Sequence, residues 1–303
     1  MRGHDKGVKM SEVRYEAPAT ASAAVALLAG ASGPARVLAG GSDLLIQMRP
    51  RLHGPQHDVQ LLVDLKGIAE LTALTEEKGG YRIGAAMACM ALVENAAFIK
   101  MWPGVTDAVK LIGSIQIKGR ASVGGNVCNA SPAADSVPAL IAAGAVASVL
   151  GPAGRRDIAV EDIAAAPGKN ILAKGEIVTS FLLPKRAPRS GDAYLRFTPR
   201  TEMDIAVVGV AVNLTLDDKG VCSAARIGLG AVAERVLLVP SAAATLIGTK
   251  VDEAALTKLA AAVSAACRPI DDKRGTIAFR TKVAGVLARR ATLIALARAQ
   301  GGH

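Results

Sequence analysis

Two short segments place a pair of glycines beside a small hydroxyl residue: LAGGSDLL (38–45) and SVGGNV (122–127). Glycine has no Cβ, so several backbone N–H groups can point at one anion and a ligand can lie close to the chain. Ser42 and Ser122 add hydroxyl donors. Although a pair of glycines is also common in tight turns, two such segments predict one extended ligand held from both sides, such as a dinucleotide diphosphate. Two unrelated turns are the alternative.

A third glycine motif, GLGAVA (228–233), matches the G-x-G-x-x-A pattern of dinucleotide-binding folds. That pattern binds nucleotide only where it opens a helix inside a β-α-β unit. Here it follows a stretch that pairs back in a hairpin, and Pro240 would interrupt a following helix. We interpret it as a strand end that contains glycine, with a nucleotide site as the alternative.

The cysteines and histidines do not form a metal-binding pattern. The four cysteines are far apart, without the C-x-x-C spacing of zinc or iron–sulfur sites. They are Cys89, Cys128, Cys222 and Cys267. Of the four histidines, only His53 and His57 are neighbours, and we favour a plain loop there over a metal site. Isolated thiols without an export signal predict a reducing, cytoplasmic location.

The chain has 303 residues, of which 51% are hydrophobic and 20% charged, so we expect a globular protein of two or three domains. It contains no run of eighteen apolar residues, which argues against a membrane span. The opening MRGHDKGVKM has no apolar signal core, and we expect residues 1–9 to precede a natural start at Met10.

The net charge is +10, and the segment from Thr257 to the end carries nine Lys/Arg against two Asp. A basic region is compatible with nucleic-acid binding. However, aromatic residues make up only 3% of the chain, too few for base-stacking platforms, and no DNA-binding motif accompanies the charge. We therefore predict a docking face or solvated helices, and no nucleic-acid partner.

The remaining pattern predicts the elements that position the glycine segments. We expect a buried strand at the start of 35–49, a strand at 61–65, two strands joined by a turn at Gly79–Gly80 within 71–86, and a strand within 175–186. We also expect a hairpin over 203–232, helices over 16–30, 90–113 and within 131–151, and alanine-rich helices beyond 241. The linker PKRAPRSG after the 175–186 strand is the clearest boundary. The chain is thus predicted to be α+β, divided near residue 188.

From about Ser11 to Arg290 the chain resembles the FAD-binding medium subunit of the molybdenum hydroxylases, a family of xanthine, carbon monoxide, aldehyde and nicotine-type dehydrogenases. Four motifs carry the resemblance: AGGSDLL, IGSIQIKGRASVGGNVCNASPAADSVPAL, RFTPRTEMDIAVVGVAV and RPIDDKRGTIAFRTKVAGVLARR. The second is the most specific. The resemblance implies a PCMH-type (VAO-like) FAD-binding domain in two parts, 10–65 and 66–188. A C-terminal domain of antiparallel sheet plus helices, of the CO dehydrogenase flavoprotein type, would follow over 189–303.

Carried over by position, the resemblance implies FAD contacts on both sides of the diphosphate and around the rings. Asp135 would hydrogen-bond the cofactor, although a helix N-cap is its common alternative role. Arg196 stands where the family usually has lysine, and Ile112 where some members have an aromatic residue. The implied cofactor-binding residues are Val37, Leu38, Ala39, Gly40, Gly41, Ser42, Asp43, Leu44, Ile112, Ser122, Val123, Gly124, Gly125, Asn126, Asp135, Val178 and Arg196.

The resemblance also implies partners. Substrate would be hydroxylated at a molybdopterin in a large subunit, and two [2Fe–2S] clusters of a small subunit would pass electrons to FAD in this chain and on to an external acceptor. A dimer of such heterotrimers is expected, with no catalytic residue or metal ligand in this chain. The alternatives are a stand-alone flavin reductase or oxidase of the same fold, or a non-enzymatic basic binding protein.

Overall fold

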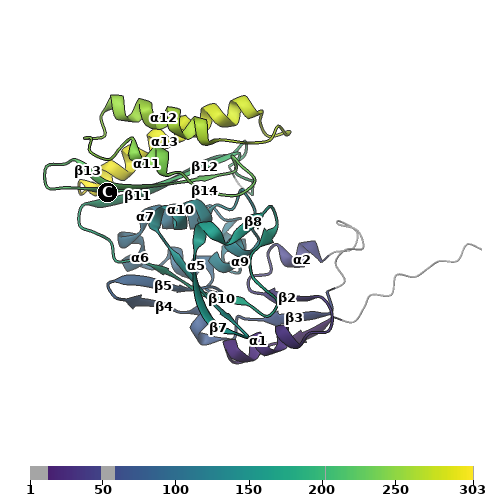
Figure 1. Cartoon of the computed structure of the whole chain (residues 1–303). Coiled ribbons are helices and arrows are strands. Elements are labelled where there is room, and N and C mark those ends of the chain that lie inside the picture. The colour runs from purple at the N-terminus through teal and green to yellow at the C-terminus, as the bar shows by residue number, and fades with distance from the viewer. Residues whose placement is uncertain (1–12, 49–58, 202, 303) are drawn as a thin grey trace, which may run out of the picture.

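The computed structural model describes residues 13–48, 59–201 and 203–302. The expected start at Met10 and the pair His53 and His57 lie outside these ranges. Figure 1 shows the described elements in layers, with α12 and α13 above the sheet of β11–β14, a row of helices below that sheet, and two further sheets below the helices.

The first sheet is small and entirely parallel, in the order β1-β3-β2. Its strands are β1 (Arg14–Glu16), β2 (Ala35–Leu38) and β3 (Leu61–Asp64), and α1 (Ala21–Gly30) packs against it. The predicted strand at the start of 35–49 is present, but the expectation that it is buried is wrong. Only Leu38 of β2 is buried, because β2 is an edge strand whose other residues line a cavity.

The second sheet is antiparallel, in the order β4-β5-β10-β6-β7. The predicted pair of strands within 71–86 is confirmed, with its turn at Lys78 and Gly79. The strands are β4 (Leu74–Glu77), β5 (Gly80–Gly84), β6 (Val146–Gly151), β7 (Gly154–Ala159) and β10 (Ile177–Leu183). The short strands β8 (Ala164–Ala166) and β9 (Lys169–Asn170) pair separately, after the 3-10 turn η1 (Val160–Asp162).

Short helices fill the middle layer. The predicted helix over 90–113 is divided into α5, α6 and α7: Asn95 interrupts it and accepts a hydrogen bond from Phe98 N (2.9 Å), and Pro103 begins the last part. The helices of this part of the chain are α2 (Leu44–Gln47), α4 (Ala69–Thr72), α5 (Cys89–Val93), α6 (Ala96–Met101), α7 (Pro103–Lys110), α8 (Ile115–Lys118), α9 (Val123–Cys128) and α10 (Ser136–Ala143).

The C-terminal part is an antiparallel sheet, β11-β12-β13-β14, with helices on both faces. Helix α10 packs on β12 and β13, whereas α13 packs on β11 and β12 from the other side (Figure 1). The elements are β11 (Ser190–Phe197), β12 (Val208–Leu216), β13 (Cys222–Gly230), β14 (Leu237–Leu238), α11 (Pro240–Ala244), α12 (Glu253–Ala266) and α13 (Ile277–Ala299). The predicted hairpin and the alanine-rich helices are confirmed.

The GLGAVA motif begins inside β13, as the interpretation of a glycine-containing strand end predicts. A Cβ on Gly228 would lie 2.3 Å from the carbonyl oxygen of Pro138 in α10, so glycine is needed there for helix–sheet packing. Each of the three sheets supports its own buried apolar cluster. Within the described ranges, no helix has the length and apolar content needed to cross a lipid bilayer.

The close approach of α13 to β11 gives a test of this packing. A Cβ on Gly191 would lie 1.9 Å from the carbonyl oxygen of Ala295, so Gly191→Ala should force the helix away from the sheet. Overpacking of this kind typically costs about 1–3 kcal/mol. Urea unfolding should show that loss, whereas Gly30→Ala, where nothing lies within 4 Å of the added Cβ, should not. Equal stability of the two variants would contradict the packing.

Candidate functional site

A cavity of about 590 Å³ lies between the first sheet and α9. Both glycine segments contribute to its wall, as do Ala85 and Ala86 after β5 and Ile177 and Val178 at the start of β10. The structure therefore brings together two segments that are far apart in the sequence, at one cavity rather than at two separate turns.

Most residues of the predicted cofactor site line this cavity. Leu38 and Val123 are instead buried behind it, and Asp135 and Arg196 are not part of its lining. The predicted residues that line it are Val37, Ala39, Gly40, Gly41, Ser42, Asp43, Leu44, Ile112, Ser122, Gly124, Gly125, Asn126 and Val178.

The glycines allow two backbone segments to touch. A Cβ on Gly40 would lie 2.1 Å from the carbonyl oxygen of Arg120, and one on Gly124 would lie 2.3 Å from that of Ala85. Both positions therefore accept only glycine without a backbone shift. Gly41 has φ +74°, a conformation that strains other residues.

The first glycine segment carries unused donors. The backbone N–H groups of Gly40, Gly41, Ser42 and Asp43 donate to no acceptor among the described residues, and the Ser42 hydroxyl has no partner there. Consecutive N–H groups in a turn form a concavity that binds anions. This wall of the cavity is thus suited to a phosphate group.

The second glycine segment is helical, rather than the turn that a pair of glycines commonly forms. Val123–Cys128 forms α9, and the Ser122 hydroxyl caps it by accepting a hydrogen bond from Gly125 N (3.1 Å). Gly124 N donates to the carbonyl of Ala85 (3.0 Å). The Ser122 cap and the close packing against the Ala85 carbonyl hold this segment in a helix, although glycine by itself is a poor helix former.

Polar side chains that the sequence did not single out complete the wall. Asn129 lines the cavity one helical turn after Asn126, and its Oδ1 accepts from Gln47 Nε2 of α2 (3.2 Å). Asn170 also lines it and donates to the Cys128 carbonyl (2.8 Å). The i, i+3 spacing of Asn126 and Asn129 was the signal that sequence reasoning missed.

Behind this wall lies a buried charged group. Asp135 accepts from the Tyr194 hydroxyl (2.8 Å) and pairs with Arg196 Nη1 (2.6 Å), both from β11. Burial raises the pKa of Asp135 to about 6, against the opposing effect of the Arg196 charge. The N-cap alternative for Asp135 is confirmed in position only: it is the N-cap residue of α10, but its side chain makes no cap hydrogen bond.

Asp135 is connected to the cavity through its neighbour. Ser136 donates from both its backbone N (3.1 Å) and its hydroxyl (2.6 Å) to Oδ1 of the cavity residue Asn126. The position of Asn126 therefore depends on the start of α10, which Tyr194 and Arg196 hold against β11.

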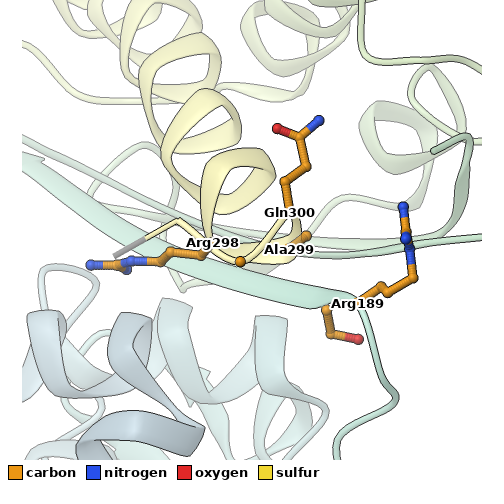
Figure 2. Close-up of a pocket in the computed structure, with 6 residues that line it drawn as sticks. Arg189, Arg298, Ala299 and Gln300 are labelled. Atoms are coloured by element: carbon orange, nitrogen blue, oxygen red, sulfur yellow. The ribbon is translucent and has the colours of Figure 1, made fainter.

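A second depression lies at the end of α13, between Arg189 and Gln300 (Figure 2). Figure 2 shows the side chains of Arg189, Arg298 and Gln300 pointing in different directions. The Arg298 guanidinium is already bonded to Asp107 Oδ2 and to the Asp192 carbonyl, both at 2.7 Å. These groups do not converge on a ligand.

The described residues contain no group of three His, Cys, Asp or Glu side chains that could hold a metal ion. The four cysteines are free thiols, and burial raises the pKa of Cys128, which lines the cavity, to about 12.

Comparison with known proteins identifies the family. Residues 10–186 match the model of the FAD binding domain in molybdopterin dehydrogenase, and residues 193–295 match that of the CO dehydrogenase flavoprotein C-terminal domain. The chain belongs to the FAD-binding subunits of the molybdenum hydroxylases.

Individual relatives agree along almost the whole length. The chain is 35% identical to the carbon monoxide dehydrogenase medium chain of Afipia carboxidovorans, over 94% of this chain and 97% of the relative. It is 29% identical to the xanthine dehydrogenase FAD-binding subunit of Escherichia coli O157:H7, over 95% and 97%. A chain of the reconstituted CO dehydrogenase from Oligotropha carboxidovorans superposes with a TM-score of 0.89 at 34% identity, over 95% and 98%.

Members of this family are oxidoreductase components, and their cofactor is FAD. The cavity of this flavoprotein fits that group. The unused N–H groups of Gly40–Asp43 suit a diphosphate, and Gly124 and Gly125 add no side chain to the part of the wall that they line. Ile112 and Val178 supply apolar surface for a ring system.

The buried carboxyl gives a pH-dependent prediction. Because the pKa of Asp135 is raised to about 6 in the folded chain, its contribution to stability is fully present below about pH 4 and is lost as the pH rises through 6. Wild type should therefore lose up to about 1.4 kcal/mol of unfolding free energy per pH unit in that window relative to Asp135→Asn. Urea unfolding of the FAD-free chains from pH 4 to 7 measures the difference, and parallel pH profiles would disprove it.

Proposed function

We propose that this chain is the electron-transfer flavoprotein of a molybdopterin-dependent hydroxylase. In this proposal, a small partner subunit supplies electrons from [2Fe–2S] clusters, a large subunit hydroxylates the substrate at a molybdopterin, and an external acceptor removes the electrons. The complex is proposed to be a dimer of such heterotrimers. The four free thiols support a cytoplasmic location.

The observation that carries the proposal is the cavity with a phosphate-binding wall. We assign the diphosphate of FAD to the N–H groups of Gly40–Asp43 and to the Ser42 hydroxyl, with Ser122–Asn126 closing the other side. When bound, FAD supplies the redox chemistry, and the protein binds, orients and tunes it. Direct contacts of FAD with Asp135 and Arg196 stay a prediction. Neither side chain lines the cavity, and the two are bonded to each other.

The charged side chains of the cavity support an electron-transfer role over a separate substrate reaction. Glu176 is held by Arg156 through bonds of 2.8 and 2.7 Å, and Lys174 donates to the Ala31 carbonyl (2.7 Å). Asp43 belongs to the segment assigned to the diphosphate, and Arg36 carries a guanidinium, which stays protonated in proteins and does not act as a base. We therefore assign no general acid or base to this chain, and place substrate conversion in the partner.

Co-expression with the adjacent reading frames tests the proposal. The expected product is a complex that contains iron and molybdenum and whose flavin absorbance bleaches when substrate is added. Full-rate oxidation of an organic substrate by the isolated chain would contradict it. So would a chain that never co-purifies with a molybdenum subunit.

A single hydroxyl tests the diphosphate assignment. Ser42→Ala removes a donor that no described residue uses, so it should leave the unfolding free energy unchanged. A hydrogen bond to a charged group contributes about 1.5–3 kcal/mol, so FAD affinity should fall about tenfold or more. Fluorescence titration of the FAD-free chain measures this. Ser241→Ala, on the exposed start of α11, is the matched control and should bind FAD like wild type. Equal affinities of the two variants would mean that the diphosphate lies elsewhere.

A further inference from the structure

The outer face of α13 carries an apolar stripe that is largely uncovered, although Phe279 also meets the ring of Phe197 in β11 edge to face, with the ring centroids 5.4 Å apart. Phe279, Val286 and Leu293 recur every seven residues, so they lie on one side of the helix, about 21 Å from first to last. Their exposed fractions are 40%, 40% and 47%, and Ile294 beside Leu293 is 36% exposed. We call these four residues the α13 stripe.

Basic side chains border the stripe. Lys282 and Arg290 are each four residues from Val286, which makes them its direct neighbours on the helix surface. Both are exposed, and neither has an ion-pair partner among the described residues. An apolar centre with a charged rim has the anatomy of a protein–protein interface.

The stripe is remote from the cavity. Helix α13 packs on β11 and β12 from the face opposite α10, so the C-terminal sheet separates the stripe from the cavity wall (Figure 1). Electron transfer slows steeply with distance, so a partner docked on the stripe would hold the complex together rather than exchange electrons there.

The charge determines which partner fits. In a two-fold dimer the same patch meets itself, so Lys282 and Arg290 of two copies would face each other. Lys282 and Arg290 have no ion-pair partner among the described residues to offset them, which makes such self-pairing unfavourable. A partner surface with an apolar ridge bordered by carboxylates satisfies both the stripe and its rim.

We propose that the α13 stripe is the assembly face on which an acidic partner subunit of the complex docks. This inference rests on the proposed function, since that supplies the partner subunits. It adds a position and a chemistry: apolar contact along Phe279, Val286 and Leu293, with carboxylates of the partner opposite Lys282 and Arg290.

The test uses the co-expressed complex and affinity purification through a tag on this chain. The double variant Val286→Asp/Leu293→Asp should lower the recovery of partner subunits at least tenfold. The rim variant Lys282→Glu/Arg290→Glu should lower it too, and should reverse the salt dependence, so that salt strengthens rather than weakens assembly. Val286→Leu should keep wild-type recovery, and Lys100→Glu, a single charge reversal at an exposed position of α6, should have no effect.

Two measurements on the isolated chains keep the result interpretable. Bound FAD and the urea unfolding midpoint should match wild type in every variant, because the stripe is exposed and remote from the cavity. Normal assembly of correctly folded stripe variants would overturn this inference alone. A wild-type chain that is itself a dimer, made monomeric by the same variants, would also overturn it, in favour of a second copy as the occupant. Failure of wild type to recover any metal-containing subunit would overturn the proposed function as well.

Discussion

The cavity depends on two places where backbone meets backbone with no side chain between. Gly40 lies against the carbonyl of Arg120, and Gly124 against the carbonyl of Ala85. The first contact joins the Gly40–Asp43 wall to the segment that leads into α9, and the second joins α9 to the end of β5, so both fix the position of the cavity walls. They also leave the N–H groups of Gly40–Asp43 turned away from the backbone hydrogen-bond ladders. A ligand with a slender, anionic middle fits this geometry better than a bulky apolar one.

Much of the fold could be predicted from the sequence, because local signals agreed with the final packing. The turn at Gly79, the hairpin around 217–220 and the alanine-rich C-terminal helices all follow from patterns within a few residues. Where the prediction was wrong, a neighbour in space decided the outcome. The 35–38 strand is mostly exposed because it is a sheet edge that lines the cavity, and the second glycine pair is helical because Ser122 caps it.

The residues of the candidate site likewise fall into those that local sequence signals predict and those that only tertiary packing brings together. Glycine pairs can be recognised from the sequence alone, because their role at the cavity depends only on the missing Cβ atom. The partners of Asp135 do not: Tyr194 and Arg196 lie some sixty residues later, and only the packing of α10 on β11 brings them near. Asn129 and Asn170 were missed because asparagine is common in turns and gives no strong signal on its own.

The bond between Asp135 and its two partners has a consequence for how this chain can be recombined. The acid lies in the region matched by the FAD-binding model, whereas the tyrosine and the arginine lie in the region matched by the C-terminal model. The two regions are therefore not interchangeable modules. A chimera that joins the front half of one relative to the back half of another inherits half of a buried ion pair from each parent. Where one parent has lysine in place of Arg196, the junction changes the geometry that holds Asn126 at the cavity. Asp135, Tyr194 and Arg196 should therefore be taken together from the same parent, although they lie on both sides of the boundary between the two regions.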